Sequence, residues 1–247
     1  MIAVIGWREL RTLFASPLAW VVLAVLQLII AWVFLGRLDA YLQLQPQLRP
    51  IANAPGITEF IAAPAFATTA VMLLMAVPLL TMRLVAEERR NRTLTLLVSA
   101  PVSAAQIILG KYLGIMLFLL AAIALAALMP LTLLAGGRLD LGLLAANVLG
   151  LVLLTAAFAA LGLFMSTLTA QPAVAAISGL GAALAFWLLD LSAPEARVKL
   201  GHLSLLRHYE SFGKGMLDTY DVAWFLLFCG VFLALAVRRL DAERLGG

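Results

Sequence analysis

The chain has 247 residues, of which 64% are hydrophobic and only 12% are charged, and its formal net charge is +4. This composition excludes an ordinary soluble domain, in which about a quarter of the residues are charged. A single cysteine excludes an internal disulfide framework and a cysteine-based metal site.

The first 16 residues predict an amphipathic helix that lies on a membrane surface. Trp7, Leu10 and Phe14 recur at three- and four-residue spacing, whereas Arg8 and Arg11 share another face. The apolar run that follows is too long for the hydrophobic region of a cleaved signal peptide. We therefore expect an interfacial helix rather than a removable leader.

Six continuous hydrophobic blocks follow this helix. A helix needs about 20 apolar residues to cross roughly 30 Å of hydrocarbon, and continuous runs are unlike the alternating pattern of a β-barrel. The expected spans are residues 17–35, 60–82, 113–135, 143–166, 172–191 and 222–237. The sequence thus predicts an all-α integral membrane protein with six transmembrane helices in one domain, residues 1–247.

Basic residues are distributed unevenly between the two sides that six spans define. The side with both termini and the segment 83–112 holds ten basic and five acidic residues, and the other side holds seven basic and eight acidic residues. Because basic residues are enriched in cytoplasmic loops, both termini and the segment 83–112 are predicted to be cytoplasmic. This bias explains the positive charge of the chain without a nucleic-acid partner.

The charged segment 83–112 predicts two short helices that meet at a proline. A first helix is expected over Ala86–Val98, and Pro101 prevents it from continuing. Ser103 can cap a second helix that begins at Ala104 and runs into the third span. Its hydrophobic side chains favour a docking surface over a plain solvated loop.

Two segments on the opposite side are less regular. Residues 37–63 contain three prolines and predict a loop before the second span. Residues 192–221 contain both histidines of the chain. His202, His208 and Glu210 lack a further well-spaced ligand, so we expect structural hydrogen bonds there rather than a metal site.

Several short motifs lie along the segment 83–112 and before the last span. They are Glu87-Glu88-Arg89-Arg90, Thr93, Leu96-Leu97, Pro101-Val102-Ser103, Leu109-Gly110-Lys111, and His208 to Asp218 followed by Asp221. Together they resemble the permeases of type-2 ABC exporters, and within that family the GldF-like permeases of gliding motility and then the permease of nitrous-oxide-reductase maturation. The chain departs from the family pattern at Arg92, where glycine is preferred, and at Thr95, where glutamate is preferred.

The resemblance implies a permease subunit in the inner membrane of a bacterial cell. Its implied partners are two ATPase subunits, a second permease copy or a paralogous permease, membrane lipid, and an accessory extracytoplasmic or GldG-like subunit. The chain has no phosphate loop of its own, so ATP and Mg are expected in the partner ATPase, and we expect neither enzymatic activity nor a cofactor in this chain. The residues implied in ATPase coupling are Glu87, Glu88, Arg89, Arg90, Thr93, Leu97, Pro101 and Ser103.

The resemblance also implies short re-entrant helices over residues 192–221 that close the outer end of a pathway. Phe212, Met216 and Leu217 are the expected gate residues. Within the spans, Gln27, Thr68 and Thr69 are candidate pathway residues, although polar side chains in lipid ordinarily bond between helices.

Two other classes of membrane protein fit the sequence less well. An ion-coupled secondary carrier is the main alternative, but it normally needs an ionisable group inside the membrane, and no span centre holds one. An intramembrane serine protease needs a nucleophile and a base that face each other, and neither histidine lies in a span. An ATP-driven exporter or a mechanotransmission complex is therefore the preferred prediction.

Overall fold

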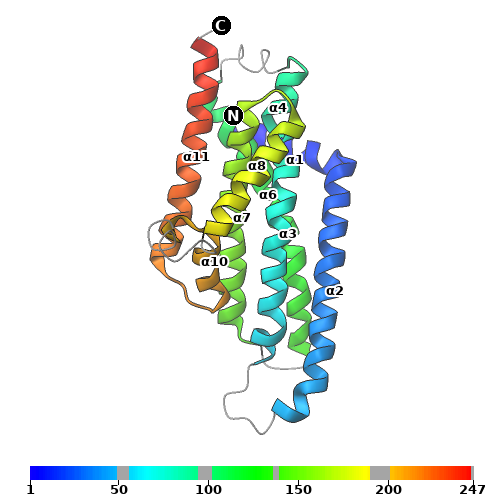
Figure 1. The fold of residues 1–247 in the computed structure, drawn as a ribbon. Helices are drawn as coiled ribbons and strands as arrows, with labels where there is room; N and C mark the ends of the chain where they lie inside the picture. The colour runs from blue at the N-terminus through cyan, green and yellow to red at the C-terminus, as the bar shows by residue number, and fades with distance from the viewer. Residues whose placement is uncertain (49–55, 94–101, 136–138, 190–200, 246–247) are drawn as a thin grey trace.

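The computed structural model describes residues 1–48, 56–93, 102–135, 139–189 and 201–245, and the regular structure in these ranges is entirely helical (Figure 1). Long helices run side by side along one axis, and short helices lie at their ends (Figure 1). The long helices are α2 (Pro17–Leu48), α3 (Ala63–Thr81), α6 (Ala104–Leu131), α7 (Leu141–Leu168), α8 (Pro172–Leu188) and α11 (Thr219–Leu245). The short ones are α1 (Ile2–Ala15), η1 (Thr58–Ala62), α4 (Arg83–Arg90), η2 (Thr132–Ala135), η4 (Gly201–Leu203) and α10 (Leu205–Gly213).

Five apolar helical stretches in the described ranges are long enough to cross a membrane. They are Pro17–Gln47, Thr58–Arg90, Ala104–Leu134, Leu141–Leu168 and Thr219–Glu243. The remaining predicted span, residues 172–191, corresponds to α8, which is apolar but has only 17 residues. At 1.5 Å per residue it is about 26 Å long, slightly less than a typical hydrocarbon core.

Helix α7 forms the centre of the bundle. It packs against α3, α6, α8, α10 and α11. Within its most apolar window 67% of the residues are buried inside the protein, against 28% for α2 and 28% for α11. Small residues allow this close packing, because Gly150 lies against the ring of Phe212 and Gly162 lies against Thr81. The hydrophobic surface of α2 and α11 is therefore left for lipid or for another subunit.

The loop predicted over residues 37–63 is wrong in its first part, because α2 continues to Leu48. Residues 36–45 are mostly good helix formers, and Gln43 donates a hydrogen bond to Asp39 one turn earlier. Pro46 lies in the last turn, so it removes one hydrogen bond, to the carbonyl of Leu42, and the helix ends two residues later. The part of the predicted loop at residues 49–55 lies outside the described residues.

The first helix predicted in the segment 83–112 is also different. It was expected over Ala86–Val98, but α4 begins at Arg83 and ends at Arg90, and residues 94–101 lie outside the description. The second helix agrees with the prediction, since Ser103 caps α6 and this helix runs without interruption into the span. Ser103 and Gln106 form a capping box, in which each side chain bonds the backbone N–H of the other.

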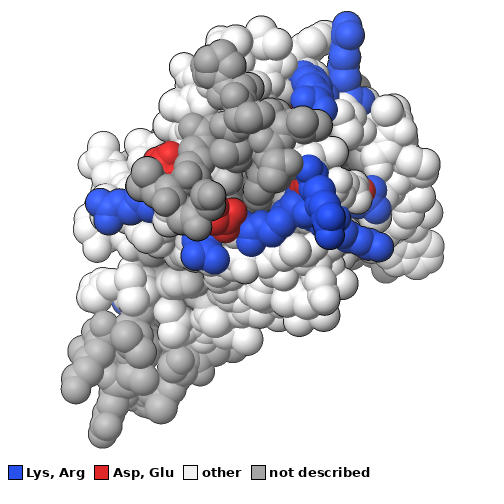
Figure 2. Space-filling view, turned by 90° about the horizontal axis from the view of Figure 1, so that it is seen from above, with Lys and Arg blue, Asp and Glu red and all other residues white. Residues whose placement is uncertain are grey.

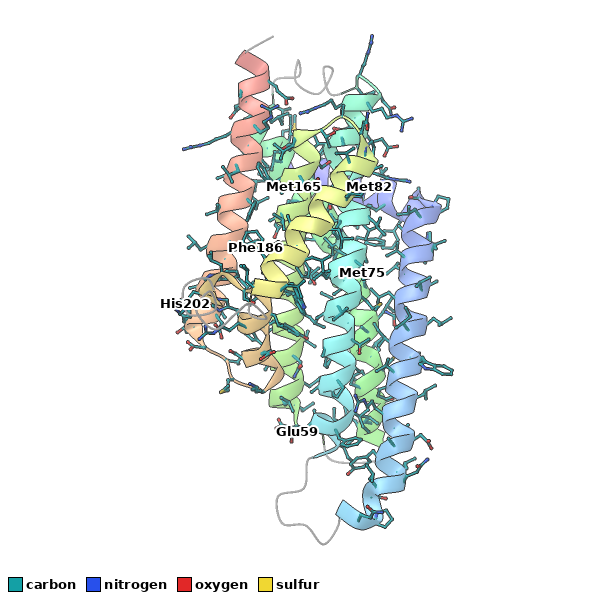
Figure 3. All side chains as sticks on the ribbon, in the orientation of Figure 1. Glu59, Met75, Met82, Met165, Phe186 and His202 are labelled. Carbon is teal, nitrogen blue, oxygen red and sulfur yellow. The ribbon has the colours of Figure 1, made fainter. Side chains whose placement is uncertain are left out.

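One end of the bundle is marked by α1, α4 and both chain termini, and we call it the basic end (Figure 1). Seen along the bundle axis, lysine and arginine side chains gather on its surface (Figure 2). Met82 lies toward the basic end of the bundle, and Glu59 lies at the opposite end, which we call the distal end (Figure 3). That the basic end faces the cytoplasm remains a prediction.

Candidate functional site: the helix junction at the basic end

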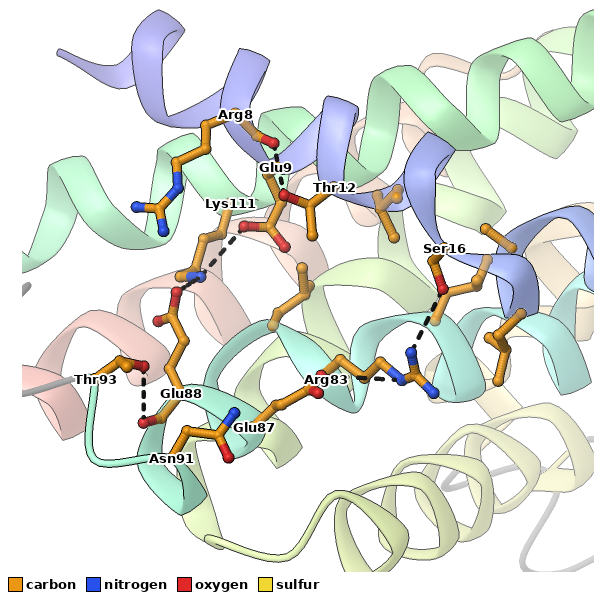
Figure 4. Close-up of a pocket in the computed structure, with 15 residues that line it drawn as sticks. Arg8, Glu9, Thr12, Ser16, Arg83, Glu87, Glu88, Asn91, Thr93 and Lys111 are labelled. Atoms are coloured by element: carbon orange, nitrogen blue, oxygen red, sulfur yellow. Dashed lines mark hydrogen bonds and ion pairs between the residues drawn. The ribbon is translucent and has the colours of Figure 1, made fainter.

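A pocket of about 320 Å³ lies between α1, the start of α2, the end of α3, α4 and α6, and we call it the junction pocket (Figure 4). Its polar lining residues are Arg8, Glu9, Thr12, Ser16, Arg83, Glu87, Glu88, Asn91, Thr93 and Lys111. Its apolar lining residues are Leu13, Leu18, Ala19, Leu80 and Leu84. The junction pocket therefore combines three cationic and three anionic side chains with a hydrophobic wall.

Lys111 is the centre of the ionic contacts in this pocket. Its side chain is only 2% exposed, and its Nζ lies 2.7 Å from Glu88 Oε1 and 3.3 Å from Glu9 Oε2. A buried ammonium group is stable only when it is paired, so these two carboxylates fix α1 and α4 against α6. The second carboxylate oxygen of Glu88, Oε2, is buried and has no hydrogen-bond partner within the described part of the chain.

Helix α1 reaches Lys111 because glycines let it approach α6 closely. A Cβ atom added at Gly110 would lie 2.7 Å from Ile5 Cβ, and one added at Gly114 would lie 2.6 Å from Glu9 Cβ. Both distances are shorter than real side-chain contacts, so only glycine fits at these positions. Helix α1 is thus packed on the protein itself and does not depend on lipid alone for its position.

Helix α4 is joined to the central helix α7 through Ser166. Helix α3 ends at Thr81 and α4 begins at Arg83, so the first N–H groups of α4 need acceptors outside their own helix. Ser166 Oγ accepts from Val85 N at 3.1 Å and from Ala86 N at 3.0 Å, and it donates to the Met82 carbonyl at 3.0 Å. Ser166 of α7 therefore caps the start of α4.

Arg89 extends this connection to the last helix. Its guanidinium donates to the Thr167 carbonyl at 2.7 Å and forms an ion pair with Glu243 of α11. Together, Glu88, Arg89 and the first turn of α4 join this helix directly to α6, α7 and α11, and Lys111 links it onward to α1. A displacement of α4 must therefore strain direct contacts to α6, α7 and α11.

Helix α4 ends in a Schellman turn. Thr93 N donates to the Glu88 carbonyl at 2.9 Å and Arg92 N donates to the Arg89 carbonyl at 3.1 Å. This turn needs a left-handed residue at its reversal point, and Arg92 takes that place with φ of 56°. Position 92 is where the resembling family prefers glycine, and the geometry gives the physical reason.

A second hollow, of about 810 Å³, lies on the other side of α4. It is lined by Met82, Arg89, Arg90, Arg92 and residues 170–173 at the start of α8. Arg90 and Arg92 are exposed. The basic end thus presents cationic groups around the tip of α4.

The predicted residues of α1 take different places. Phe14 lies against Phe118 of α6, with ring centroids 5.1 Å apart, whereas Trp7 is 55% exposed. The prediction that Arg8 and Arg11 share a face away from Trp7 is wrong for Arg11, whose guanidinium lies 5.2 Å from the centre of the Trp7 ring. Residues four apart are neighbours on a helix, and a cation over an indole face is favourable.

The remaining predicted coupling residues are only partly described. Leu97 and Pro101 lie outside the described residues. Glu87 lies at the surface, 3.9 Å from Arg83, and the Thr93 hydroxyl donates to the Glu88 carbonyl at 3.2 Å. The structure therefore brings Glu88, Arg89 and Thr93 to one helix end but assigns them contacts within the chain.

The candidate pathway residues make ordinary structural contacts. Gln27 Nε2 donates to the Ala122 carbonyl of α6 at 3.3 Å, which joins α2 to the bundle. The hydroxyls of Thr68 and Thr69 donate to carbonyls one turn earlier in their own helix. A role for these residues in a pathway stays a prediction.

The predicted gate residues differ in their exposure. Phe212 of α10 is fully buried against Gly150 of α7, whereas Met216 and Leu217 are 56% and 60% exposed. Phe212 therefore packs the core, and a role for the three residues as a gate stays a prediction.

His208 makes the kind of hydrogen bonds expected for the histidines of this segment. Its Nδ1 lies 2.6 Å from Asp221 Oδ1, and its Nε2 lies 3.0 Å from the His202 carbonyl oxygen. Its ring stacks on Trp224 with centroids 4.3 Å apart. These contacts fix α10 to the start of α11, and in the described residues no group of three or more metal-ligating side chains gathers.

Comparison with known proteins agrees with this architecture. The family model described as "ABC-2 family transporter protein" matches residues 47–191, which is more than half of the chain and includes α3, α4, α6, α7 and α8. No curated protein matches the chain. With its helical membrane-type bundle and this match, the chain belongs to the ABC-2 family of transporter proteins.

Proposed function

We propose that this chain is the permease subunit of an ATP-driven transporter and that it docks separate ATPase subunits through α4 and the residues that follow it, up to Ser103. The single observation that carries the proposal is the position of α4. This helix lies at the basic end, and it contacts α6, α7 and α11 directly and α1 through Lys111. A force applied to α4 is therefore passed to most of the bundle.

The membrane family supports the general part of this proposal, since ABC-2 proteins are membrane subunits that generally pair with ATPase subunits. The finer parts are ours. We place the basic end in the bacterial cytoplasm, two ATPase subunits against it, and a second permease copy or a paralogous permease against the exposed spans. In this proposal the partner ATPase binds ATP and Mg, and the complex exports a substrate or transmits mechanical force.

Exposed charges near the tip of α4 support docking of an acidic partner surface. Arg90 is exposed, whereas Glu88 and Arg89 are partly buried in contacts within the chain. Exposed side chains can be changed without breaking the fold. Arg90 is therefore the sharpest position at which to separate docking from stability.

The test is co-purification of the permease with its cognate ATPase, together with the ATPase rate of the complex. Arg90→Glu should weaken the complex and lower the ATPase activity that depends on it. Arg37→Glu is the matched control, because Arg37 is also exposed but lies on α2 beyond the expected span. An unchanged complex with Arg90→Glu, or equal loss with Arg37→Glu, would contradict docking at α4.

A stronger perturbation changes Glu87-Glu88-Arg89-Arg90 to alanine. We expect loss of both the complex and coupled ATPase activity, and a lower melting temperature because Lys111 and Glu243 lose partners. If the complex and coupled activity survive this change, the docking assignment is wrong. The permease alone is expected to hydrolyse no ATP.

The proposal for the closer relationship is that the chain works in a GldF-like or nitrous-oxide-reductase-maturation-like complex. It is supported by the motif from His208 to Asp218 followed by Asp221, whose His208–Asp221 contact fixes α10 to α11. Affinity purification from native membranes tests it. A GldG-like accessory subunit in the purified complex supports this assignment, and a different accessory subunit contradicts it.

A further inference from the structure

His208 is buried where η4, α10 and α11 meet, and both nitrogens of its ring face acceptors. Its side chain is 4% exposed, and that of Asp221 is 8% exposed. Nδ1 lies 2.6 Å from Asp221 Oδ1, and Nε2 lies 3.0 Å from the carbonyl oxygen of His202. A neutral imidazole has one N–H, so it would donate to one oxygen and turn a lone pair toward the other. The geometry therefore requires two N–H groups, which only the imidazolium form has.

The surroundings of the ring also favour the cation. The ring of His208 stacks on Trp224 with centroids 4.3 Å apart, and a cation over an indole face is attracted to it. An imidazolium and the Asp221 carboxylate form a neutral pair, whereas a neutral imidazole would leave a buried negative charge, which is costly. A carboxyl group ordinarily gives up its proton at a lower pH than an imidazolium, so the proton of this pair belongs on the ring.

No other charge in the described part of the chain is buried against this pair. Helix α10 packs on α3, α7, α8 and α11, and the first three of these carry no lysine, arginine, aspartate or glutamate. On η4, α10 and α11, the other nearby titratable side chains are His202, Arg207, Tyr209, Glu210, Asp218 and Tyr220. All of them except Tyr209 are exposed, so water solvates their charges, and Tyr209 is an uncharged phenol. Asp221 therefore sets the charge state of His208.

The same ring carries the polar connections of this junction. Its bond to Asp221 is the one hydrogen bond or ion pair between α10 and α11 within the described ranges, and its bond to the His202 carbonyl joins η4 to α10. Because each bond uses a different ring nitrogen, the loss of one proton removes one of the two bonds. It also leaves Asp221 as a buried charge without its cation.

We propose that His208 and Asp221 form a protonation-dependent latch. The imidazolium holds η4 and α10 against the start of α11, and loss of its proton loosens this junction. The folded chain holds the proton, whereas an unfolded chain gives it up above about pH 6.5. The contribution of the latch to stability is therefore full near about pH 6 and is lost as the pH rises.

The first experiment reads the protonation state directly, by NMR of the purified full chain labelled with ¹⁵N-histidine. The chain has two histidines, and His202→Asn removes the other signal but keeps the backbone carbonyl at position 202. At about pH 8 an exposed histidine is mostly neutral. We expect the ring of His208 to show two protonated nitrogens at this pH. A neutral ring with one protonated nitrogen would overturn the proposal.

The second experiment compares thermal unfolding in detergent between about pH 6.5 and about pH 8.5. In the wild type the folding equilibrium constant should fall by up to about tenfold per pH unit, as for one proton held only by the folded chain. His202→Asn is the matched control and should keep this slope. Asp221→Asn removes the carboxylate that stabilises the cation and should abolish the slope. An equal slope in wild type and Asp221→Asn, or loss of the slope in His202→Asn, contradicts the latch.

Hydrogen exchange measures whether the pair holds α10 in place. At about pH 6.5, Asp221→Asn imitates the released state, so the amides of α10 should exchange about tenfold faster than in wild type, as for loss of one charged hydrogen bond. The amides of α7 should not change. Unchanged exchange in α10, or an equal rise in α7, would refute a local latch. All three experiments are done without the ATPase, so their outcomes are independent of the docking proposal.

Discussion

Replacing Gly114 by alanine tests whether α1 is fixed by its contact with α6. The new Cβ would lie 2.6 Å from Glu9 Cβ and 2.8 Å from the Gly6 carbonyl oxygen. Neither atom is the free end of a flexible side chain, so α1 must retreat by about 0.8 Å to reach the 3.4 Å of an ordinary contact. Overpacking of this kind costs about 1–3 kcal/mol, and alanine returns up to about 1 kcal/mol of helix propensity. With the full propensity gain, the expected net loss is about 0–2 kcal/mol.

The assay is thermal unfolding of the purified chain in detergent, with Gly181→Ala and Gly230→Ala as controls. Both control glycines lie inside helices with no atom within 4 Å of an added Cβ, so alanine there should be neutral or slightly stabilising. Gly114→Ala should melt at a lower temperature than either control. It should also expose α1 to limited proteolysis, because its retreat lengthens the 3.3 Å contact between Lys111 and Glu9. A melting temperature equal to that of the controls would refute the close packing of α1 on α6.

Three other substitutions test separate contacts by the same melting assay. Ser166→Ala leaves two buried N–H groups of α4 without an acceptor, which costs about 1–3 kcal/mol for each group. It should destabilise the chain far more than the control Ser178→Ala, because the Ser178 hydroxyl donates to a carbonyl of its own helix, α8. Arg92→Gly relieves the left-handed backbone at the end of α4 and should stabilise the chain by about 1 kcal/mol; a lower melting temperature would mean that the arginine side chain outweighs this strain. His208→Phe keeps a ring on Trp224 but removes the donor that faces the buried Asp221, so it should destabilise by a few kcal/mol and be partly rescued by Asp221→Asn.

The helical architecture could be predicted from the sequence because the relevant signals are local. Five of the six predicted spans each overlap one of the long apolar helical stretches, although several of these stretches extend six to twelve residues further, and Ser103 marked the start of α6 through its capping pattern. Where the prediction was wrong, a local signal was overridden. Three prolines suggested a loop from residue 37, but good helix formers carried α2 to Leu48.

The contacts of the junction could not be predicted in the same way, because they join residues that are distant in sequence. In the sequence, Lys111 stands out only as the end of the motif Leu109-Gly110-Lys111. A lone basic residue in an apolar helix nevertheless indicates that its side chain needs an acidic partner. Its partners Glu9 and Glu88 are 102 and 23 residues away. His208 and Asp221 were both noted, but their pairing depends on how α10 folds back against α11.

The bonds of Ser166 also set an order on biogenesis. The N–H groups of Val85 and Ala86 find their acceptor on a residue 80 or more positions later in the chain. While the ribosome is still making the third span, the start of α4 therefore lacks two of its native hydrogen bonds, and Arg89 lacks the Thr167 carbonyl. Helix α4 can therefore reach its final geometry only after α7 has been inserted beside α3. A half-made chain thus does not yet display the finished α4 surface to a partner.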